Sequence, residues 1–323
     1  MIAYRDFVLR TIDYSKSMTL LGVLYLACGV ATLQSGFISL DKHPEELLEL
    51  RPKKKSCNLY IQHEIPGSLD VQGWHQDHIA VSVQKYTHNE DDADRISITL
   101  TQTEHGVITL AIVENEELHK RAQVDVTVHI PHQLATTITA QNDVSITHAD
   151  NTIRVETEKG SITTQKTRGN LHLKTENGDI RSTQSHGTIS AHTERGGITI
   201  EDSYTSIDAE TKRGPITVDC ARVPSTARIE LRAQKRGTIT LAIPESTQAH
   251  LIADTTRGTV TSNVLITLER HTMVLNHGTY QDFQRHIRGI IGQQTTAEIK
   301  LSGTKDIHIT TNDIEPDEEY TIS

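Results

Sequence analysis

The sequence has few aromatic residues and few cysteines for its length. Only 4 % of its 323 residues are Phe, Tyr or Trp, and there is one Trp. That is little for a compact core, but it suits a thin core of Ile, Leu and Val. The three cysteines, Cys28, Cys57 and Cys220, are too few and too scattered for a disulfide framework or a zinc ribbon. We expect Cys57 and Cys220 to be buried thiols, with a bridge between them as the alternative.

Positive charge is also in deficit, since the formal net charge is −10 at pH 7. Nucleic-acid binding needs a basic face, so nucleic acid is not expected as a main partner. The sequence also lacks a Gly-x-Ser-x-Gly elbow, a phosphate-binding loop and a Gly-x-Gly-x-x-Gly turn after a strand. We therefore do not expect an enzyme, and we assign no catalytic, cofactor-binding or metal-binding residue.

A nine-residue repeat dominates residues 143–218. An apolar residue returns at every ninth position, and a glycine stands two positions before most of them. The apolar positions are Val144, Ile153, Ile162, Leu171, Ile180, Ile189, Ile198, Ile207 and Ile216, and the glycines are Gly160, Gly169, Gly178, Gly187, Gly196 and Gly214. A glycine followed by alternating apolar and polar residues is typical of a tight turn leading into a short strand, with the glycine supplying a positive φ.

One such unit cannot bury its apolar side alone, whereas stacked units share a core. The repeat therefore predicts an all-β fold, a single-domain parallel β-solenoid or β-helix with strands about 4.8 Å apart along its axis. If each coil holds two units, two ladders result: Ile162, Ile180 and Ile198 on one side, and Leu171, Ile189 and Ile207 on the other. An antiparallel meander of hairpins is the alternative, although meanders seldom keep so strict a period.

Residues between the apolar positions are expected to face outward, as Arg181 would between Ile180 and Ser182. The outward residues are Ser, Thr, Lys, Arg, His and Glu, with both charges mixed along the chain. A solvated sheet surface explains such a face. A flat face that binds a glycan or a protein is the functional alternative, but no aromatic residues and no stripe of one charge mark it.

Residues 18–40 contain no charged side chain. A helix of that length spans the ~30 Å hydrocarbon core of a membrane. We expect an uncleaved single-pass transmembrane anchor here, after a short polar tail at residues 1–17. A signal peptide with its apolar region at Met18–Ala27 is one alternative. In another, Leu26-Ala27-Cys28-Gly29 acts as a lipoprotein box and Cys28 carries the lipid.

The charges beside this run leave the orientation in the membrane open. Several Lys and Arg follow it within fifteen residues, which by the positive-inside rule would keep the domain in the cytoplasm. Long downstream domains are, however, translocated largely regardless of charge. We expect the domain to lie outside the cytoplasm, in the periplasm or on the cell surface.

The remaining chain divides into three parts: a juxtamembrane linker at residues 41–56, the solenoid domain at 57–311 and an acidic C-terminal tail at 312–323. In the linker, Pro44–Leu50 could form one or two helical turns. The polar run at 88–94 is expected to be an exposed loop, and residues 280–291 a short helix or an ordered loop. Residues 297–309 are expected to form the final coil, whose edge needs a cap against aggregation.

Several segments together resemble one protein family. They are Gly67–Trp74, Ile79-x-Val81, Val124–Pro131, Gly178-Asp179-Ile180 and Gly237–Leu241. Their order resembles a bacterial family of domains of unknown function labelled "putative adhesins", related to the head domain of autotransporter adhesins. The resemblance covers about residues 57–310 and implies a β-solenoid on the bacterial envelope behind a signal or an anchor. The family has no agreed catalytic residues, so none is carried over.

Histidines and paired carboxylates are the remaining candidates for chemistry. Among the 18 histidines, the densest group is Trp74-His75-Gln76-Asp77-His78, where His75, Asp77 and His78 could ligate zinc. The carboxylates at 88–94 could bind calcium, but their spacing fits no loop of that kind. A polysaccharide-acting β-helix enzyme would need carboxylate pairs such as Glu201 with Asp202 or Asp208 with Glu210. We expect a polar turn and salt-bridged surfaces at these places.

The sequence thus predicts a non-enzymatic, membrane-anchored bacterial envelope protein, an adhesin-like or scaffold solenoid that binds a glycan or a protein through a broad rigid face. Two alternatives stay open. One is a cytoplasmic, membrane-tethered scaffold that polymerises by self-association through the solenoid ends. The other is the polysaccharide-acting enzyme.

Overall fold

The computed structural model describes residues 40–53, 57–88, 90–115, 122–268, 284–293 and 296–312. These belong to a single unit that begins at Leu40. The predicted N-terminal tail, nearly all of the predicted anchor with Cys28, and the tail beyond Asn312 lie outside the described residues. Among the helices of the described ranges, none is both long and apolar enough to cross a membrane.

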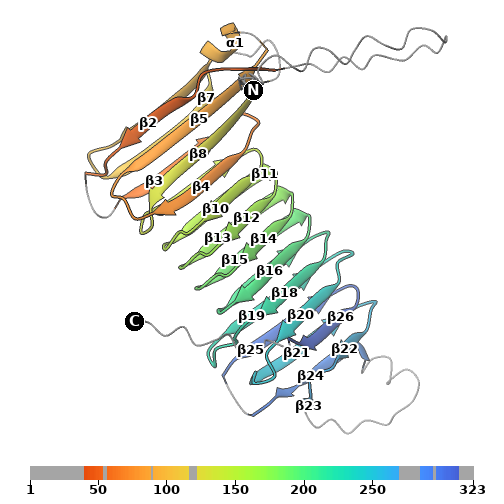
Figure 1. The fold of residues 1–323 in the computed structure, drawn as a ribbon. Helices are drawn as coiled ribbons and strands as arrows, with labels where there is room; N and C mark the ends of the chain where they lie inside the picture. Colours follow the sequence, from red (N-terminus) through yellow and green to blue (C-terminus); the bar gives the residue numbers. More distant parts are fainter. Residues whose placement is uncertain are drawn as a thin grey trace, which may run out of the picture. The chain divides into compact units, whose positions relative to one another are not determined.

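The centre of the unit consists of two facing parallel sheets whose strands alternate along the chain (Figure 1). Sheet A contains β10 (Val144–Thr147), β12 (Ile162–Gln165), β14 (Ile180–Thr183), β16 (Ile198–Ser203) and β18 (Ile216–Cys220). Sheet B contains β11 (Ile153–Lys159), β13 (Leu171–Asn177), β15 (Ile189–Arg195) and β17 (Ile207–Thr211). Each coil therefore contributes one strand to each sheet, and the all-β parallel solenoid is confirmed.

The register is the one that the repeat predicts. Ile162 pairs with Ile180 and Ile180 with Ile198 in sheet A, while Leu171 and Ile207 flank Ile189 in sheet B. All six side chains are buried. Within a strand, burial alternates, so that Arg181 is exposed between Ile180 and Ser182. The two-units-per-coil prediction is correct, and the meander is excluded for these strands.

The repeated glycines have two physical roles. Gly169 and Gly187 have φ values of 118° and 122°, as expected for a tight turn. Gly178 does not have a positive φ, but a Cβ on it would lie 2.0 Å from the carbonyl oxygen of Gly160. At this second turn, glycine is required because consecutive coils approach too closely for any side chain.

Buried threonines tie these turns to the strands. Thr175, Thr193 and Thr211 stand at equivalent positions of three successive coils and are fully buried. Thr193 donates from Oγ1 to the carbonyl oxygen of Gly178 at 3.0 Å, and Thr211 donates to that of Gly196 at 2.9 Å. Each hydroxyl thus satisfies a turn carbonyl in the neighbouring coil, which explains why threonine can occupy a core position.

The N-terminal coils do not follow the order of the sequence. β3 (Asn58–His63) lies between β7 (Val107–Glu114) and β9 (Ala135–Ala140) in sheet B. Likewise β4 (Leu69–Trp74) lies between β8 (Gln123–Pro131) and β10 in sheet A. The first coil in the sequence is therefore the second coil in space.

Antiparallel strands cover this end of both sheets. They are β1 (Asp41–Lys42), β2 (Glu46–Leu50) and β5 (Ile79–Thr87) in sheet A, and β6 (Ile96–Gln102) in sheet B. Residues 41–50, expected to be linker with helical turns, are instead part of the folded sheet. The acidic run expected to be an exposed loop contains a short helix, α1 (Glu90–Asp94), with Asp92 and Ala93 buried.

A buried lysine joins these covering elements. Lys85 on β5 is 7 % exposed, and its Nζ lies 2.7 Å from a carboxylate oxygen of Glu46 on β2. The same Nζ donates to the backbone carbonyls of Ala93 and Ile96 at 3.3 and 3.1 Å. A buried ammonium needs such partners, so Lys85 fixes β2, α1 and β6 against β5.

The C-terminal end repeats the N-terminal pattern. The strands here are β19 (Arg228–Ala233), β20 (Ile239–Ile243), β21 (Ala249–Thr255), β22 (Val260–Ser262), β25 (Glu298–Gly303) and β26 (Ile307–Thr311). β25 lies between β19 and β21, and β26 lies between β20 and β22. The coil at 297–309, expected to be final, is thus last in sequence but second to last in space.

Two further antiparallel strands, β23 (Ile266–Leu268) and β24 (His286–Ile291), extend sheet B beyond β21. The expected helix or loop at residues 280–291 is thus a strand from His286 to Ile291. Sheet A ends in β22, which is only three residues long. A short edge strand offers few unpaired backbone groups to another chain.

Candidate functional site

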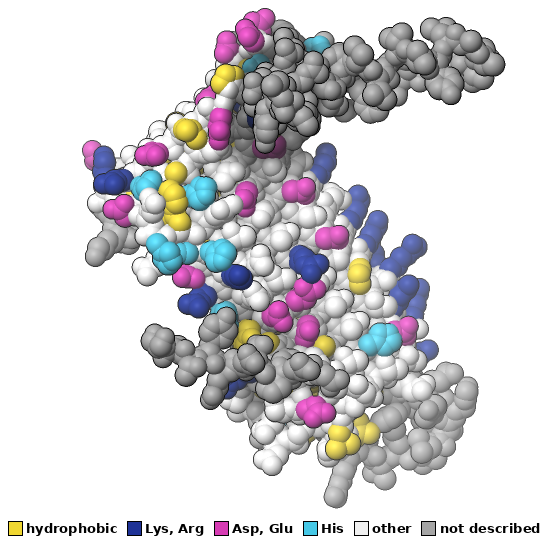
Figure 2. Space-filling view, viewed as in Figure 1, with side chains coloured by type: hydrophobic (Ala, Val, Ile, Leu, Met, Phe, Trp, Pro, Cys, Tyr) yellow, Lys and Arg dark blue, Asp and Glu magenta, His cyan; other side chains and the backbone are white. Residues whose placement is uncertain are grey.

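A row of turns from sheet A to sheet B forms a groove along one edge of the solenoid, which we call the histidine groove. Its volume is about 380 Å³. Histidine side chains gather on the face drawn in Figure 2 over the first coils. The residues that line the groove are His75, His132, His148, Asp150, Lys166, Arg168, Gln184, His186 and Tyr204.

The coil length brings these residues together. Asp150, Arg168, His186 and Tyr204 are one coil apart in succession, and backbone bonds such as Arg168 to Ala149 and His186 to Thr167 hold the turns in register. A second row in the same turns, His148, Lys166, Gln184 and Asp202, has left-handed φ values of 51° to 56°. Within each of these two rows, residues of successive coils therefore lie about 4.8 Å apart along the axis.

Ring contacts shape the groove. His132 donates from Nδ1 to the backbone carbonyl of His148 at 2.5 Å, because a carbonyl can only accept, and the His75 ring meets the His132 ring edge-on at 4.5 Å. The rings of His186 and Tyr204 stack with centroids 4.5 Å apart and an interplanar angle of 16°. Tyr204 is 37 % exposed. This pair offers a flat apolar surface beside several hydrogen-bond donors.

The three residues considered as zinc ligands, His75, Asp77 and His78, do not come together. His75 turns to His132, whereas the ring of His78 lies 4.6 Å from that of Trp74, whose Nε1 donates to the carbonyl of His78. Asp77 lies 3.9 Å from His78 and 3.8 Å from Arg51. No set of three or more His, Cys, Asp or Glu side chains in the described part of the chain is arranged to hold a metal ion.

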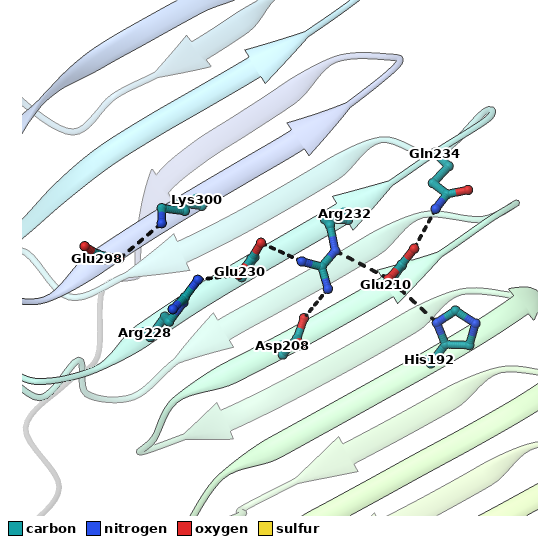
Figure 3. Close-up of polar contacts among 9 residues, drawn as sticks. All are labelled: His192, Asp208, Glu210, Arg228, Glu230, Arg232, Gln234, Glu298 and Lys300. Atoms are coloured by element: carbon teal, nitrogen blue, oxygen red, sulfur yellow. Dashed lines mark hydrogen bonds and ion pairs between the residues drawn. The ribbon is translucent and has the colours of Figure 1, made fainter.

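Three of the four carboxylates expected on salt-bridged surfaces, Glu201, Asp208 and Glu210, lie in ion pairs. Arg232 on β19 reaches Asp208 at 2.9 Å, Glu210 at 3.4 Å and Glu230 at 2.5 Å on the outer face of sheet B (Figure 3). Around this centre lie His192, Arg228 and Gln234, with the pair Lys300–Glu298 on β25. On sheet A, Glu201 pairs with Arg181 at 2.7 Å.

Simpler ion pairs continue along the same face of sheet B. Lys212 donates a hydrogen bond to Glu194, and this bond and the positive charge lower the pKa of Glu194. Glu156 likewise raises the pKa of Lys174 by accepting its hydrogen bond and by its charge. Both pairs join neighbouring coils. On the face of sheet B, side chains of opposite charge thus pair across neighbouring coils.

The two described cysteines are buried and not joined in a disulfide, as expected. Burial and the nearby charge of Asp219 raise the pKa of Cys220 to about 12, so its thiol stays protonated. Cys28, the candidate for lipid attachment, lies outside the described residues.

Most residues of the histidine groove escape a local reading of the sequence. His132, His148, Arg168 and Tyr204 are far apart along the chain and belong to no motif. The signal that could have found them is the coil length: residues one coil apart, such as Arg168 and His186, are neighbours in any stack with two units per coil.

These features together define a class, a two-sheet parallel β-solenoid with antiparallel strands at its ends and a groove formed by its turns. The profile of the family described as Toastrack DUF4097 matches residues 67–282. The chain belongs to this family, and the predicted resemblance is confirmed.

Three solved structures are similar over 83 % of this chain at 12 % sequence identity each. They are a "putative cell adhesion protein" from Clostridium sporogenes (99 % of that chain, TM-score 0.27), a "putative adhesin" from Bacteroides fragilis (97 %, 0.44) and a "putative lipid binding protein" from Parabacteroides distasonis (97 %, 0.40). With these TM-scores, they add nothing to the assignment of a function. No curated protein matches the sequence.

Proposed function

We propose that the protein is a non-enzymatic, membrane-anchored component of the bacterial envelope that binds a glycan or a protein ligand. Residues 18–40 would form the anchor. The solenoid would lie outside the cytoplasm and act as an adhesin-like scaffold. Its broad, rigid side would meet the ligand.

The observation that carries this proposal is the alignment of outward side chains from coil to coil. Strand pairing fixes the register between neighbouring coils. Residues such as Arg168 and His186 are therefore held at a fixed spacing along the axis before any ligand binds. A ligand that extends along the solenoid can then contact many coils at once. Preorganised contacts of this kind favour binding because little side-chain and backbone freedom is lost.

The histidine groove is the part of this side best shaped for a ligand. The His186–Tyr204 ring pair can pack against the flat face of a sugar, and Arg168 and Lys166 can donate to its oxygen atoms. The ion-paired face of sheet B offers a wider but already neutralised contact area.

Protease treatment of cells tests the placement. Intact cells, cells with a permeabilised outer layer and lysed cells would be treated, following both the fragment after residue 57 and a tag added at Ser323. We expect loss of the tag before lysis. Protection of the tag until lysis would contradict the proposal and favour a cytoplasmic scaffold.

Glycan binding tests the non-enzymatic role. The full chain in detergent would be incubated with a panel of envelope and host glycans. We expect retention of at least one glycan with no change in its length. Shortening of a glycan, lost on changing Asp208→Asn, would contradict the proposal and favour an enzyme.

A further inference from the structure

A second edge of the solenoid, opposite the histidine groove, presents a row of cations. This edge is made of the turns from sheet B to sheet A. Figure 2 shows Lys and Arg side chains following one another along one margin of the stack. The residues of this basic edge, in spatial order, are Lys159, Arg195, Arg213, Lys235 with Arg236, Lys305 and Arg257.

Register places these cations at equivalent positions. Lys159 pairs with Asn177 and Asn177 with Arg195, and the backbone nitrogen of Gly196 then bonds to the carbonyl of Arg213. Further along, the nitrogen of Lys235 bonds to the carbonyl of Lys212. Among the turns from sheet B to sheet A that lie in space from β11 to β22, only the turn at Asn177 has no cation. All the cations of the basic edge are exposed.

The basic edge differs from the faces in how its charge is balanced. Lys174, Lys212 and Arg232 on the face of sheet B are ion-paired. Within the described residues, by contrast, no carboxylate lies in ion-pair range of any cation of the basic edge. Carboxylates do stand in or beside its first turns, at Glu158, Glu176, Asp179 and Glu194. Glu194 is held by Lys212, and Asp179 accepts from the backbone nitrogen of Gly197. From Arg213 onward the one carboxylate in these turns is Asp306, which accepts from Thr259.

We propose that the basic edge binds a linear acidic polysaccharide lying along the solenoid axis, with carboxylates on successive sugars meeting cations on successive coils. Coils about 4.8 Å apart give a cation row of about the same repeat as sugars in an extended chain. Arg pairs with a carboxylate through two parallel hydrogen bonds. The inference rests on the proposed binding role but concerns a surface other than the groove.

Two other polyanions fit the edge less well. A membrane surface is normally met by cations together with large apolar side chains. The exposed large apolar residues of the described chain, Leu47, Tyr60, Tyr204, Leu265 and Leu268, are not in these turns. Single-stranded nucleic acid is normally held by a basic groove with aromatic rings for the bases. The basic edge has no aromatic side chain.

Binding of oligogalacturonates to the full chain in detergent micelles tests the inference. The affinity is expected to rise with oligomer length, to be undetectable for galacturonic acid and for neutral malto-oligosaccharides, and to fall with salt. The variant R213Q/K235Q/R236Q is expected to bind a long oligomer roughly tenfold more weakly, from three exposed contacts. The control K174Q/R181Q/R228Q removes the same charge from the two faces and should bind like the wild type.

Equal loss in both variants, or no loss in the basic-edge variant, would overturn the inference. So would the absence of any length dependence in the wild type, which needs no variant to fold. Phosphatidylglycerol vesicles and an oligothymidine are the competing probes. Binding of either one, lost in the basic-edge variant, without binding of oligogalacturonate would assign the edge to a membrane or to nucleic acid. Because this test uses purified protein, a cytoplasmic location found in cells would contradict the proposed function alone.

Discussion

The central coils and the terminal coils are built from the same strand-turn unit but joined by different rules. In the centre, each strand pairs with strands one coil earlier and one coil later in the sequence, as Ile180 does with Ile162 and Ile198. At the C-terminal end, Ile299 pairs with Ile229 and Leu251, and at the N-terminal end Leu59 pairs with Ile108 and Thr136. In the centre, paired strands are close together in the sequence. At each end, one coil is inserted between two coils that lie far from it along the chain.

This difference shows which interactions each region depends on. The centre needs close backbone approach at each turn from sheet B to sheet A, so glycine is required there once per coil. Each end needs an inserted coil whose strands form backbone hydrogen bonds with the coils on both of its sides. Long-range pairing of this kind is slow to form because a large loop must close first.

Removal of the inserted C-terminal coil should have the largest effect. In a chain ending before Ala297, β21 and β22 lose the strands between themselves and β19 and β20. We expect their amide hydrogen-exchange protection to fall to nearly that of an unfolded chain, while β13 and β15 stay protected. The matched control ends after Asn312 and should behave like the full chain. Unchanged protection of β21 in the shorter chain would show that the inserted coil is dispensable.

Two adjacent glycines test the close approach in the centre. A Cβ on Gly196 would lie 2.0 Å from the carbonyl oxygen of Gly178, whereas a Cβ on Gly197 would have its nearest contacts at 3.5 Å, on Pro215. We expect Gly196→Ala to lower the free energy of unfolding by about 3 kcal/mol or more, and Gly197→Ala to change it by less than about 0.5 kcal/mol. Urea unfolding measures both. Equal effects would mean that the turns can separate at little cost.

Acid should loosen the N-terminal end through His63 on the inserted strand β3. Its side chain is 1 % exposed, and burial lowers its pKa from 6.5 to about 4. In that interval the unfolded chain binds a proton that the folded chain excludes. Stability is therefore lost as pH falls from 6.5 to about 4, by up to about 3 kcal/mol.

The variant His63→Leu should lose less stability between pH 7.5 and 4.5 than the wild type, as measured by urea unfolding. The control His172→Leu changes an outward-facing side chain on β13 and should keep the acid sensitivity. If His63→Leu loses as much stability as the wild type, then another group controls the acid response.

The smallest effects should come from the buried threonines, which occur in both regions. Thr211 makes one hydrogen bond, to the carbonyl of Gly196, whereas Thr255 donates to that of Lys305 at 2.7 Å and accepts from the nitrogen of Gly258 at 3.2 Å. We expect Thr211→Val to lower the free energy of unfolding by about 1 kcal/mol and Thr255→Val by about 2 kcal/mol. Thermal denaturation compares them, and the reverse order would indicate that the end is held mainly by apolar packing.

The predictable part of the fold is the part in which sequence neighbours are also spatial neighbours. The spacing of Ile162, Ile180 and Ile198 was enough for the register, because each coil packs on the next. Nothing in the local pattern of β3 or β25 indicates which strands they separate, since those partners lie far along the chain. The covering strands β1 and β2 were missed because their residues follow the predicted anchor and have no glycine turn.

The basic edge and the histidine groove could not be predicted from the sequence for a related reason. Along the chain, Glu194 precedes Arg195, so the sequence shows mixed charges and no stripe of one sign. Coiling separates such neighbours into parallel rows, and one row becomes the basic edge. The histidine groove forms in the same way from residues one coil apart. A local search for motifs therefore finds neither surface.

The inserted N-terminal coil also determines how the molecule can carry load. A pull on Leu40 would first strip away β1 and β2, which lie at the margin of sheet A and pair with β5. It would then reach β3, which is hydrogen-bonded on both sides, to β7 and β9. A strand held on two sides cannot be peeled from an edge, because two rows of bonds must break together. Under tension, β1 and β2 would therefore detach at low force, and the chain would lengthen by a short stretch. Further extension would require the higher force that removes β3.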